Sequence, residues 1–585
     1  MRGEGKTSGG IACAILQNPA CLYPGYRHMI MLKKCVALRN GERGRIVLIT
    51  GEVEDMFYYR KLAKKLRNTF GKRPEGEYFD GDMNWIGTFY EDCRKEGLDP
   101  FYVDDITWND LNMDAVYKQI NACRSTAGER QLYYMMRRPM NREEFEKQNG
   151  LIRMMEQEPE KRLKLQLILS RIGVYRSVFL GHILRPQNPS RLWLIIYCLM
   201  LLYMPVSVLC VVLFGFSLLW MPILSMMLNT FVHLKRSKDC ENDIRAVNYC
   251  ILLAVGLNRM KKLKDPELDR YLQGAYEEMK PLHFLVRGGA VVTDPLLKTD
   301  LDYLLSFFML DLIYFEIVRH RLARYHDNFR AIQEAVGKVD AAISIASFRK
   351  SLKTMCIPEM DYEAEKPYIH AEGMVHPLLT DAVPNPVELD RSMLITGSNA
   401  SGKSTYLKAV IMNALLAQTI CRCTCTSYSG SPFRIYTSMA LADDLLSGES
   451  YYIAELKSLK RILEDRSGKE FVVCAIDEVL RGTNTVERIA ASTEVLKELN
   501  KRGILSLIAT HDVELCSLAG DGYEKAHFEE HVTDSDIVFD YQIKPGAAVT
   551  RNAIRLLKLM GFDNGIVDAA HKRADRYMET GKWSE

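Results

Sequence analysis

The chain contains 41 consecutive residues, 192–232, without an Asp, Glu, Lys or Arg. An α-helix rises 1.5 Å per residue, so such a run extends about 60 Å, twice the roughly 30 Å hydrocarbon core of a bilayer. Pro205, Gly215 and Pro222 offer places for a break, and a turn within residues 206–216 would let a second helix return. The run predicts a two-pass transmembrane hairpin, and the alternative is a helical hairpin buried in a large protein core.

Both flanks of this run are basic. Arg185 and Arg191 precede it, and Lys235, Arg236 and Lys238 follow it. Because positive charge marks the cytoplasmic side of membrane helices, we expect both ends of the hairpin in the same compartment. A lipid bilayer is therefore one predicted partner of the chain.

The rest of the chain is rich in charge, and 26% of its 585 residues are charged. That length exceeds one hydrophobic core, so roughly three or four domains are expected. A net charge of +3 gives no global argument for nucleic acid, so any such argument must be local. Fifteen scattered cysteines suit a reducing compartment. The one cluster, residues 421–425, has alternate thiols that can gather a metal, but its spacing favours a plain core strand.

The sequence MLITGSNASGKSTYLKAV, residues 393–410, resembles a nucleotide site. An apolar strand leads into a glycine-rich loop and then a helix, which is the setting that the G-x-x-x-x-G-K-[ST] phosphate loop requires. We expect Lys403 to reach the β- and γ-phosphates of ATP and Ser404 to hold Mg²⁺. The predicted nucleotide-binding residues of the loop are Gly397, Ser398, Asn399, Ala400, Ser401, Gly402, Lys403, Ser404 and Thr405.

Two further apolar strands end in polar residues. EFVVCAIDE ends in Asp477, which is placed to hold Mg²⁺, and Glu478, which can deprotonate the attacking water. ILSLIATHD follows about 30 residues later and ends in Thr510, His511 and Asp512. We predict Glu478 and His511 as catalytic residues, with His511 contacting the γ-phosphate; the alternative for His511 is a structural role.

Long stretches on both sides of the hairpin have helical spacing. One seam has steps of three and four throughout, which predicts a long helix packed against another helix. Its residues are Phe315, Val318, Leu322, Tyr325, Phe329, Ile332, Val336, Val339 and Ile343. The segment is expected to be a structural lever.

At this point the sequence resembles a known family. IDEVLRGTNTVERIAAS, residues 476–492, is similar to the D-E-x-G-R-G-T-S-T signature of the MutS family of DNA mismatch-repair ATPases. RIYTSMALADDLLSGESYYIAELKSLKRIL and PGAAVTRNAIRLLKLMGFDNGIVDAA are similar to that family's ATPase domain, and GMVHPLL to its G-x-H-P motif. DDITWNDLNM and STAGERQLYYMMRRPM resemble the start of its helical core. The resemblance covers roughly residues 100–585.

The resemblance implies further functional residues. His376, in the G-x-H-P motif, is expected to contact the nucleotide. In the family two ATPase domains face each other, so a homodimer is implied, together with DNA as a partner. The residues suited to reach the nucleotide of a partner subunit are Ser447, Gly448, Thr483 and Asn484; the alternative is that they are ordinary turn residues.

The chain also departs from the family pattern. Leu480 stands where the signature has Gly, and Asn484 where it usually has Ser. No convincing counterpart of the mismatch-reading domain is found, since that domain inserts an aromatic residue between bases and the Phe-x-Glu tripeptides at Phe89 and Phe528 are chance matches. The family's soluble members lack a membrane hairpin. The chain therefore resembles a membrane-anchored member rather than a mismatch sensor.

A basic run, YYRKLAKKLRNTFGKRP, lies in the N-terminal region. Its seven Lys and Arg residues fall within residues 60–73 with no acid among them, and aromatic residues interleave. Three interpretations stay open: a solvated helix face, a surface for nucleic-acid phosphates and a surface for anionic lipid headgroups.

The predicted fold is multidomain. Residues 1–100 form a basic N-terminal region, residues 101–356 a helical core and lever split by the 192–232 hairpin, and residues 357–585 an α/β P-loop ATPase domain of the ABC type. We predict an ATPase with ATP and Mg²⁺, placed in the bacterial inner membrane with both termini cytoplasmic. Its expected role is a dimeric DNA clamp; the alternative is a membrane motor or nucleotide-switched scaffold that does not act on DNA.

Overall fold

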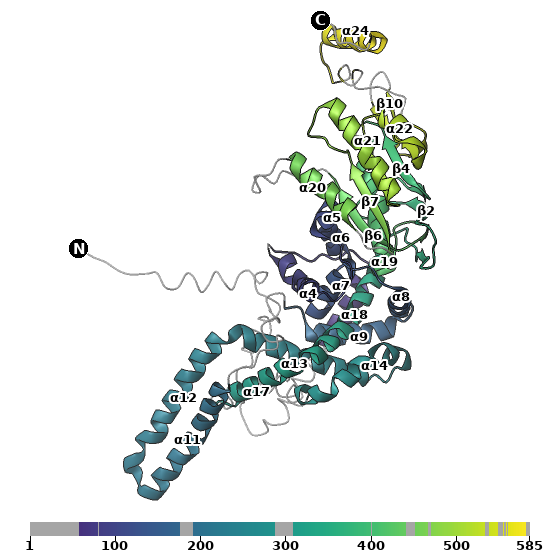
Figure 1. The fold of residues 1–585 in the computed structure, drawn as a ribbon. Helices are drawn as coiled ribbons and strands as arrows, with labels where there is room; N and C mark the ends of the chain where they lie inside the picture. The colour runs from purple at the N-terminus through teal and green to yellow at the C-terminus, as the bar shows by residue number, and fades with distance from the viewer. Residues whose placement is uncertain are drawn as a thin grey trace, which may run out of the picture. The chain divides into compact units, whose positions relative to one another are not determined.

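The computed structural model describes residues 58–79, 81–175, 191–286, 308–398, 401–439, 451–465, 470–532, 537–547, 554, 557 and 560–580. Residues 62–585 form one compact unit. In it a mostly helical N-terminal part precedes a C-terminal α/β part (Figure 1), which confirms this aspect of the predicted multidomain fold.

The helical part is built around contacts of α18 with α7 and α8. α4 packs against α7, where Ile86 and Tyr90 are buried beside Tyr133. The helices before the hairpin are α4 (Asp82–Glu96), α5 (Asp105–Asp110), α6 (Met113–Ile120), α7 (Thr126–Met136), α8 (Arg142–Gln157) and α9 (Pro159–Ile172). Those after it are α13 (Glu241–Lys261), α14 (Pro266–Glu278), α17 (Leu310–Arg324) and α18 (His326–Ser351), with a 3₁₀ turn at Lys280–Leu282.

The predicted lever seam lies on two helices rather than one. The break is at Tyr325, whose φ of −114° and ψ of 38° leave helical geometry between α17 and α18. The other eight seam residues are buried, from Phe315 to Ile343. The seam therefore faces the helical core as predicted, while the helix carrying it is interrupted once.

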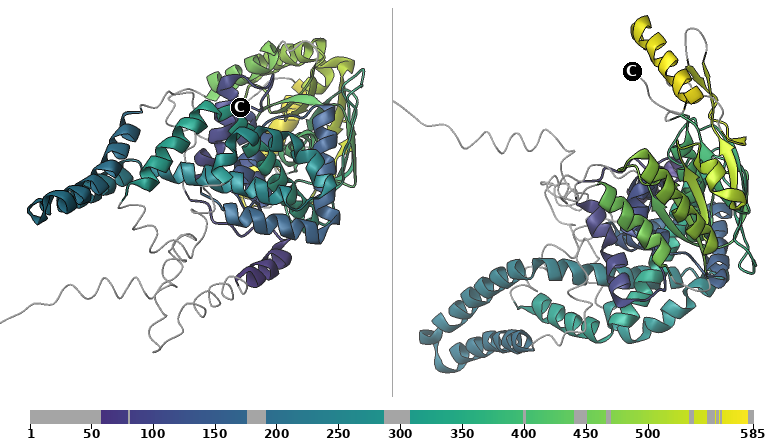
Figure 2. Two further views of the ribbon diagram at one scale, coloured as in Figure 1. Left: turned by 90° about the horizontal axis from the view of Figure 1, so that it is seen from below. Right: turned by 45° about the horizontal axis from the view of Figure 1, so that its top comes forward.

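The uncharged run forms a helical hairpin. α11 (Leu192–Phe214) and α12 (Trp220–Asp239) lie side by side in Figure 1 and in both views of Figure 2. The chain reverses at Gly215, whose φ of 97° suits glycine, and a short 3₁₀ turn at Phe216–Leu218. Pro205 lies inside α11 and does not end it. Both helices are long and apolar enough to cross a membrane.

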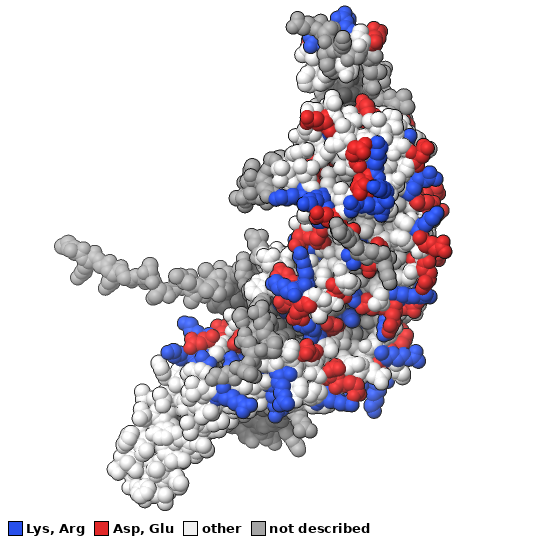
Figure 3. Space-filling view, viewed as in Figure 1, with Lys and Arg blue, Asp and Glu red and all other residues white. Residues whose placement is uncertain are grey.

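The hairpin is apolar outside and polar inside. Leu202 and Val212 are 60% and 75% exposed, and the space-filling view shows the hairpin without blue or red side chains over most of its length (Figure 3). The few buried side chains of the two helices are polar or amphipathic: Tyr197, Ser207, Ser225 and Asn229. This polarity is the reverse of that of a helix pair in water.

Ion pairs fix the base of the hairpin to α17. His233 lies 2.7 Å from Asp311, and Arg236 lies 4.0 Å from Glu316, both on α17. Within the hairpin, the guanidinium of Arg236 lies 4.1 Å from the ring centroid of Trp193 and donates to the hydroxyl of Tyr197. α17 therefore connects the hairpin to the lever helix α18.

The α/β part contains a six-stranded sheet in the order β12-β9-β4-β8-β7-β6, in which only β12 pairs antiparallel. A second sheet has the order β1-β5-β2-β3, and β10 pairs with β11. The helices are α19 (Lys403–Ile420), α20 (Tyr451–Glu464), α21 (Thr485–Lys501), α22 (Leu515–Leu518) and α24 (Asn564–Thr580), with a 3₁₀ turn at Gly520–Gly522. The strands are β1 (Glu359–Met360), β2 (Ile369–Met374), β3 (Asn385–Leu389), β4 (Ser392–Thr396), β5 (Ser427–Gly430), β6 (Phe433–Ser438), β7 (Phe471–Asp477), β8 (Leu505–Ala509), β9 (Tyr523–His527), β10 (Glu530–Val532), β11 (Ile537–Phe539) and β12 (Lys544–Pro545).

The cysteine cluster is buried, but the prediction of a core strand there is wrong. Cys421 ends α19 in a left-handed conformation. The backbone of Cys423 then forms an isolated antiparallel β-bridge with Cys356, before β5 begins. Three buried thiols therefore lie in a turn between helix and strand. Among the described residues no group of three or more His, Cys, Asp or Glu could hold a metal ion.

Candidate active site

Three neighbouring strands bring the predicted motifs to one edge of the sheet. β4 pairs in parallel with β8, and β8 with β7. The carboxyl ends of parallel strands meet at the same edge. Hydrogen bonds lock them together there: Thr510 N donates to Ile395 O at 2.9 Å, and Glu478 N to Ala509 O at 2.8 Å. The phosphate loop, the Asp477–Glu478 pair and His511 therefore lie together.

The glycines of the loop are required by its geometry. Gly397 has a φ of 140°, and a Cβ there would lie 2.5 Å from the backbone oxygen of Phe528. Gly402 has a φ of 106° and precedes the first residue of α19. Such a loop brings backbone N–H groups and a helix N-terminus close to an anion. Asn399 and Ala400 lie outside the described residues.

Lys403 is buried inside the loop. Its Nζ donates to the backbone oxygens of Gly397 at 2.7 Å and Ser398 at 2.6 Å. Burial lowers the pKa of Lys403 to about 8, although Asp477, Glu478 and Glu530 act in the opposite direction. The lysine is thus a desolvated cation held by carbonyl groups, which phosphate oxygens could replace.

Glu478 and His511 form a direct pair. Nε2 of His511 lies 2.9 Å from Oε1 of Glu478 and 3.5 Å from Nζ of Lys403. The hydrogen bond with His511 is the main cause that lowers the pKa of Glu478, and Arg481, 2.5 Å from Oε2, adds to it. The structure therefore shows Glu478 as an ionised, doubly held carboxylate. It must leave Arg481 before that oxygen can accept a proton from water.

The predicted Mg²⁺ ligands are a hydroxyl and a carboxylate. Ser404 is partly exposed in the first turn of α19, and Asp477 is the buried last residue of β7. Oxygen donors of this kind suit Mg²⁺, which takes one or two protein ligands beside phosphate oxygens. Thr405, the last predicted loop residue, is exposed. These residues fit the ion in chemistry and in position along the edge.

Two other loop residues have partners within the site. Ser398 Oγ donates to Glu530 at 2.8 Å, and Ser401 Oγ donates to the backbone oxygen of Ser398 at 2.8 Å. Glu530 begins β10 and was not predicted from sequence. Its carboxylate and those of Asp477 and Glu478 all act on Lys403.

His376 lies against α19 rather than within the loop. The backbone oxygen of the preceding Val375 accepts from Asn413 of α19 at 3.2 Å, and Nδ1 of His376 accepts from Leu378 N at 3.3 Å. Burial, with a contribution from Lys408, lowers the pKa of His376 to about 4. The imidazole is therefore neutral at pH 7, and its contact with nucleotide stays a prediction.

The signature segment has local structural roles. Asn484 caps α21 by accepting from Glu487 N at 3.0 Å, and Thr483 Oγ1 donates to the Glu487 carboxylate at 3.0 Å. Their role toward a partner subunit stays a prediction. Ser447 and Gly448 lie outside the described residues.

Leu480 adopts the backbone conformation that explains the family's glycine. Its φ is 61°, in the left-handed region that is costly for a residue with a Cβ. The side chain is nevertheless buried among apolar residues. Glu455 accepts from the backbone N–H groups of Leu480 and Arg481. Buried area and two hydrogen bonds therefore offset the strain at this position.

Sequence reasoning missed a residue of the helical part that reaches this sheet. Oδ2 of Asp110, at the end of α5, accepts from Thr437 Oγ1 at 2.7 Å and Met439 N at 3.1 Å. Met439 follows Ser438, the partner of Ile476 in the β6–β7 ladder, so it lies beside the strand end that carries Asp477. Burial raises the pKa of Asp110. The signal was present in DDITWNDLNM, which was interpreted only as the start of the helical core.

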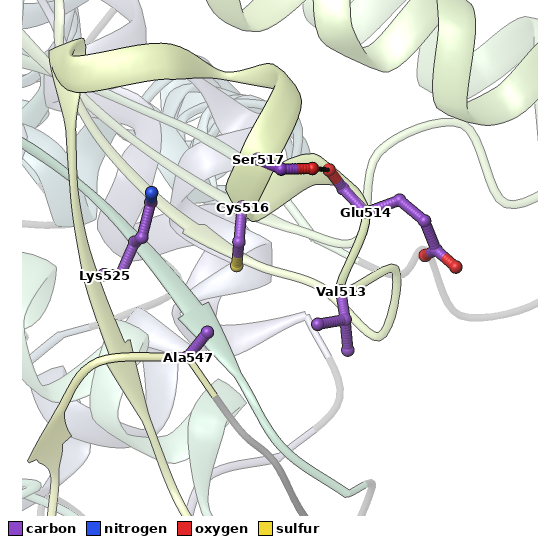
Figure 4. Close-up of a pocket in the computed structure, with 6 residues that line it drawn as sticks. All are labelled: Val513, Glu514, Cys516, Ser517, Lys525 and Ala547. Atoms are coloured by element: carbon purple, nitrogen blue, oxygen red, sulfur yellow. Dashed lines mark hydrogen bonds between the residues drawn. The ribbon is translucent and has the colours of Figure 1, made fainter.

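A shallow pocket lies just beyond the His511 motif. It is lined by Val513, Glu514, Cys516, Ser517, Lys525 and Ala547. Figure 4 shows the Ser517 hydroxyl donating to the backbone oxygen of Glu514. None of the predicted site residues lines this pocket, and we assign no ligand to it.

Comparison with known proteins agrees with the resemblance. Residues 393–578 match the family model MutS domain V. The DNA mismatch repair protein MutS of Natronomonas pharaonis is 30% identical over 269 residues, which cover 44% of this chain and 30% of the relative. DNA mismatch repair protein MutS 2 of Halobacterium salinarum is 30% identical over 270 residues, with the same coverage. MutS of Thermus thermophilus is 31% identical over 201 residues, covering 33% of this chain and 24% of the relative.

The chain thus matches less than a third of the length of these relatives. The family model covers β4 to α24, the part that holds the phosphate loop, Asp477, Glu478 and His511. Residues 393–578 of this C-terminal α/β part are thus a MutS domain V, which supports membership of the MutS family.

Proposed function

We propose that the chain is a membrane-anchored ATPase. The observation that carries the proposal is the meeting of Lys403, Glu478 and His511 at the ends of three adjacent parallel strands. A buried lysine in a glycine loop neutralises phosphate charge, and a carboxylate next to it can orient and deprotonate water. His511 holds that carboxylate in place.

Each residue then has a defined task. Lys403 exchanges its two carbonyl partners for phosphate oxygens. Ser404 and Asp477 would hold Mg²⁺, which neutralises phosphate charge when bound. A carboxylate with a lowered pKa is a weak base, so the ion pair between Arg481 and Glu478 must open first. Glu478 can then take a proton from water. The general base is thus controlled by a residue of the same signature segment.

The hairpin supports the membrane part of the proposal. A helix pair in water buries its apolar side chains, but α11 and α12 expose theirs and bury Ser207, Ser225 and Asn229. Small and polar residues between helices are typical of pairs surrounded by lipid, where apolar packing gives no hydrophobic gain. The basic flanks on both sides support a topology in which both termini and the ATPase domain face the cytoplasm at a bacterial inner membrane.

For the substrate of the ATP cycle we propose DNA, acted on by a homodimer. Three relatives carry the name DNA mismatch repair protein, and the matched region is the one that holds the nucleotide site. The predicted domain limits at residues 100 and 356 remain part of this proposal. A motor acting on the membrane, or a nucleotide-switched scaffold, is the alternative that the hairpin favours.

The test is ATP hydrolysis by the purified chain in detergent, with and without duplex DNA. Glu478→Gln should bind ATP normally and lose turnover by about 10²-fold or more, because the amide cannot accept the proton. Lys403→Ala should lose nucleotide binding itself. Normal turnover in Glu478→Gln would contradict the assignment of the base. ATP hydrolysis that duplex DNA leaves unchanged would favour the motor or scaffold.

A further inference from the structure

The basic run of the N-terminal region is anchored to the far end of the lever. Leu66 is buried, and Gly71 N donates to Ser347 Oγ of α18 at 3.0 Å. Gly71 packs so closely on the side chain of Lys350 that a Cβ there would lie 2.7 Å from Lys350 Cγ. The run is therefore held in a defined position and joins the last turn of α18.

In this anchored position, several lysine and arginine side chains are exposed to solvent. We define the lever-end basic surface by exposed lysine and arginine residues of the basic run and of the end of α18 with the residues just after it. They are Lys64, Lys65, Lys72, Arg73, Lys350 and Lys353. Among the described residues, the first four have no ion-pair partner within 4.0 Å. Two nearby acids already have cationic partners, since Glu160 pairs with Arg67, and Glu156 with Arg349 and Arg422. The exposed Glu75 and Glu77 follow Arg73 in the chain and border the surface.

Phe70, the aromatic residue of the anchored part of the run, is not available for base stacking, whereas Tyr58 at the start of the run is exposed. The guanidinium of Arg162 lies 3.5 Å from the ring centroid of Phe70, and Nζ of Lys350 lies 5.5 Å from it. Single-strand binding relies on aromatic side chains that accept stacked bases. A surface of exposed cations with its aromatic ring covered instead suits a phosphodiester backbone.

The position of the basic surface along the lever distinguishes between nucleic acid and lipid as its ligand. The hairpin base contacts α17, before α18 begins, whereas the basic surface lies at the last turn of α18. The helix from His326 to Ser347 spans 21 residue steps, so about 32 Å of helix lie between the two. Attraction to anionic headgroups decays within a Debye length of about 8–10 Å. Lipid at the hairpin base is therefore too distant to be the ligand of this surface.

We propose that the lever-end basic surface binds the phosphate backbone of duplex DNA. This inference rests on the proposed DNA function and names the surface that performs it. Binding there is independent of base sequence and steeply dependent on salt. It would place DNA beside the last turn of α18, where the lever meets the ATPase part.

The experiment measures the affinity for a labelled duplex between 50 and 200 mM salt. The full chain is held in nanodiscs of zwitterionic lipid. The test variant combines Lys64→Gln, Lys65→Gln, Lys72→Gln and Arg73→Gln. Each phosphate contact contributes about 0.9 to the slope of log affinity against log salt. We expect the slope to become shallower by about 3 to 4, and the affinity at low salt to fall by roughly 10²-fold or more.

A matched control removes the same charge elsewhere. It combines Lys147→Gln, Lys338→Gln, Lys497→Gln and Lys501→Gln, all exposed lysines paired with a glutamate of their own helix. We expect this control to keep the wild-type slope. Equal slopes for the test variant and the wild type would show that DNA binds elsewhere on the chain and would contradict the assignment to this surface.

Two other outcomes are informative. A wild-type chain that hydrolyses ATP but binds no duplex would refute the proposed DNA function itself. In a parallel assay, binding to vesicles of phosphatidylcholine and phosphatidylglycerol is measured for both variants. Loss of vesicle binding in the test variant, with DNA binding unchanged, would identify an anionic lipid surface and overturn the inference.

Discussion

Two apolar helices of this chain have opposite surroundings. In α19, which follows the phosphate loop, 15 of 18 residues are buried. In α11, which has 23 residues, only Tyr197 and Ser207 are buried. Both sequences are mostly apolar, but α19 contains Lys403 and Lys408, whereas α11 has no charged residue. The difference is that protein surrounds one helix and leaves the other bare.

The comparison teaches what the surroundings of α11 must be. In water, exposed leucine side chains cost about 25 cal/mol for each Å² of apolar surface. No other part of the described protein covers those of α11. α12 adds polar side chains to the inside of the pair rather than apolar ones. The same hydrophobic effect therefore buries α19 in protein and supports the proposal that α11 lies in lipid.

The largest expected effect comes from truncating one leucine in each helix. Leu415 in α19 is fully buried, so Leu415→Ala should lower the free energy of unfolding by roughly 3–5 kcal/mol through lost burial and a cavity. Leu202→Ala in α11 should cost about 0.5 kcal/mol or less, because lipid or detergent fills the space. Denaturation in detergent, followed at a fluorophore in the ATPase part, measures both. Similar losses would remove the contrast between the helices.

Charge at the exposed face of α11 sharpens the contrast further. Leu202→Arg should destabilise the hairpin in a bilayer by about 3 kcal/mol, the cost of arginine near the centre of a spanning helix. The matched control is Leu379→Arg, at an exposed leucine of the α/β part, which should change stability by less than about 0.5 kcal/mol. Protease protection in nanodiscs measures both. A neutral or stabilising Leu202→Arg would indicate that α11 faces water.

The first residue of α19 gives a pH test. Lys403 has a pKa lowered to about 8, and ATP binding requires its charged form. Below pH 8 the lysine is already protonated, so affinity stays constant. Above pH 8 binding must take up a proton, and affinity should weaken by about tenfold at pH 9.

The measurement is the Kd for ATP between pH 7.5 and 9.5. Glu530 acts to raise the pKa of Lys403, so Glu530→Gln should move the onset of weakening to lower pH. An affinity that stays level up to pH 9.5 in both proteins would show that Lys403 is not desolvated in this way.

The smallest expected effect lies between the hairpin helices. Asn229 is buried there, and Asn229→Leu should lower stability in a bilayer by only about 0.6 kcal/mol, the average for polar contacts between membrane helices. Thermal unfolding of the full chain in nanodiscs measures the change. A loss of several kcal/mol would mean that Asn229 has a role beyond holding α11 against α12.

Local sequence was sufficient for the strand and helix on either side of the predicted phosphate loop, for the two motif strands and for the helical hairpin. Each is written in consecutive residues, as a glycine pattern with an apolar strand or as an uncharged run. The seam on α17 and α18 was equally readable, but the break at Tyr325 has no local signal such as Pro or Gly.

Long-range contacts were not readable. Asp110 and Thr437 are separated by 327 positions, and only the docking of α5 on β6 joins them. Leu480 has a left-handed backbone conformation because it lies in the tight turn after β7, a position that favours glycine. From its apolar side chain, the sequence predicts only a buried core residue. Arg481 was part of a recognised signature, yet its ion pair with Glu478 depends on the fold of that same turn.

The most direct test of a membrane-anchored ATPase is phosphate release by salt-washed membranes from cells that express the chain. We expect Mg²⁺- and ATP-dependent release to sediment with the membranes of the wild type, and to be nearly absent from membranes that contain equal amounts of Glu478→Gln. Activity that remains in the soluble fraction after washing, or equal release by the two membrane preparations, would contradict the proposal.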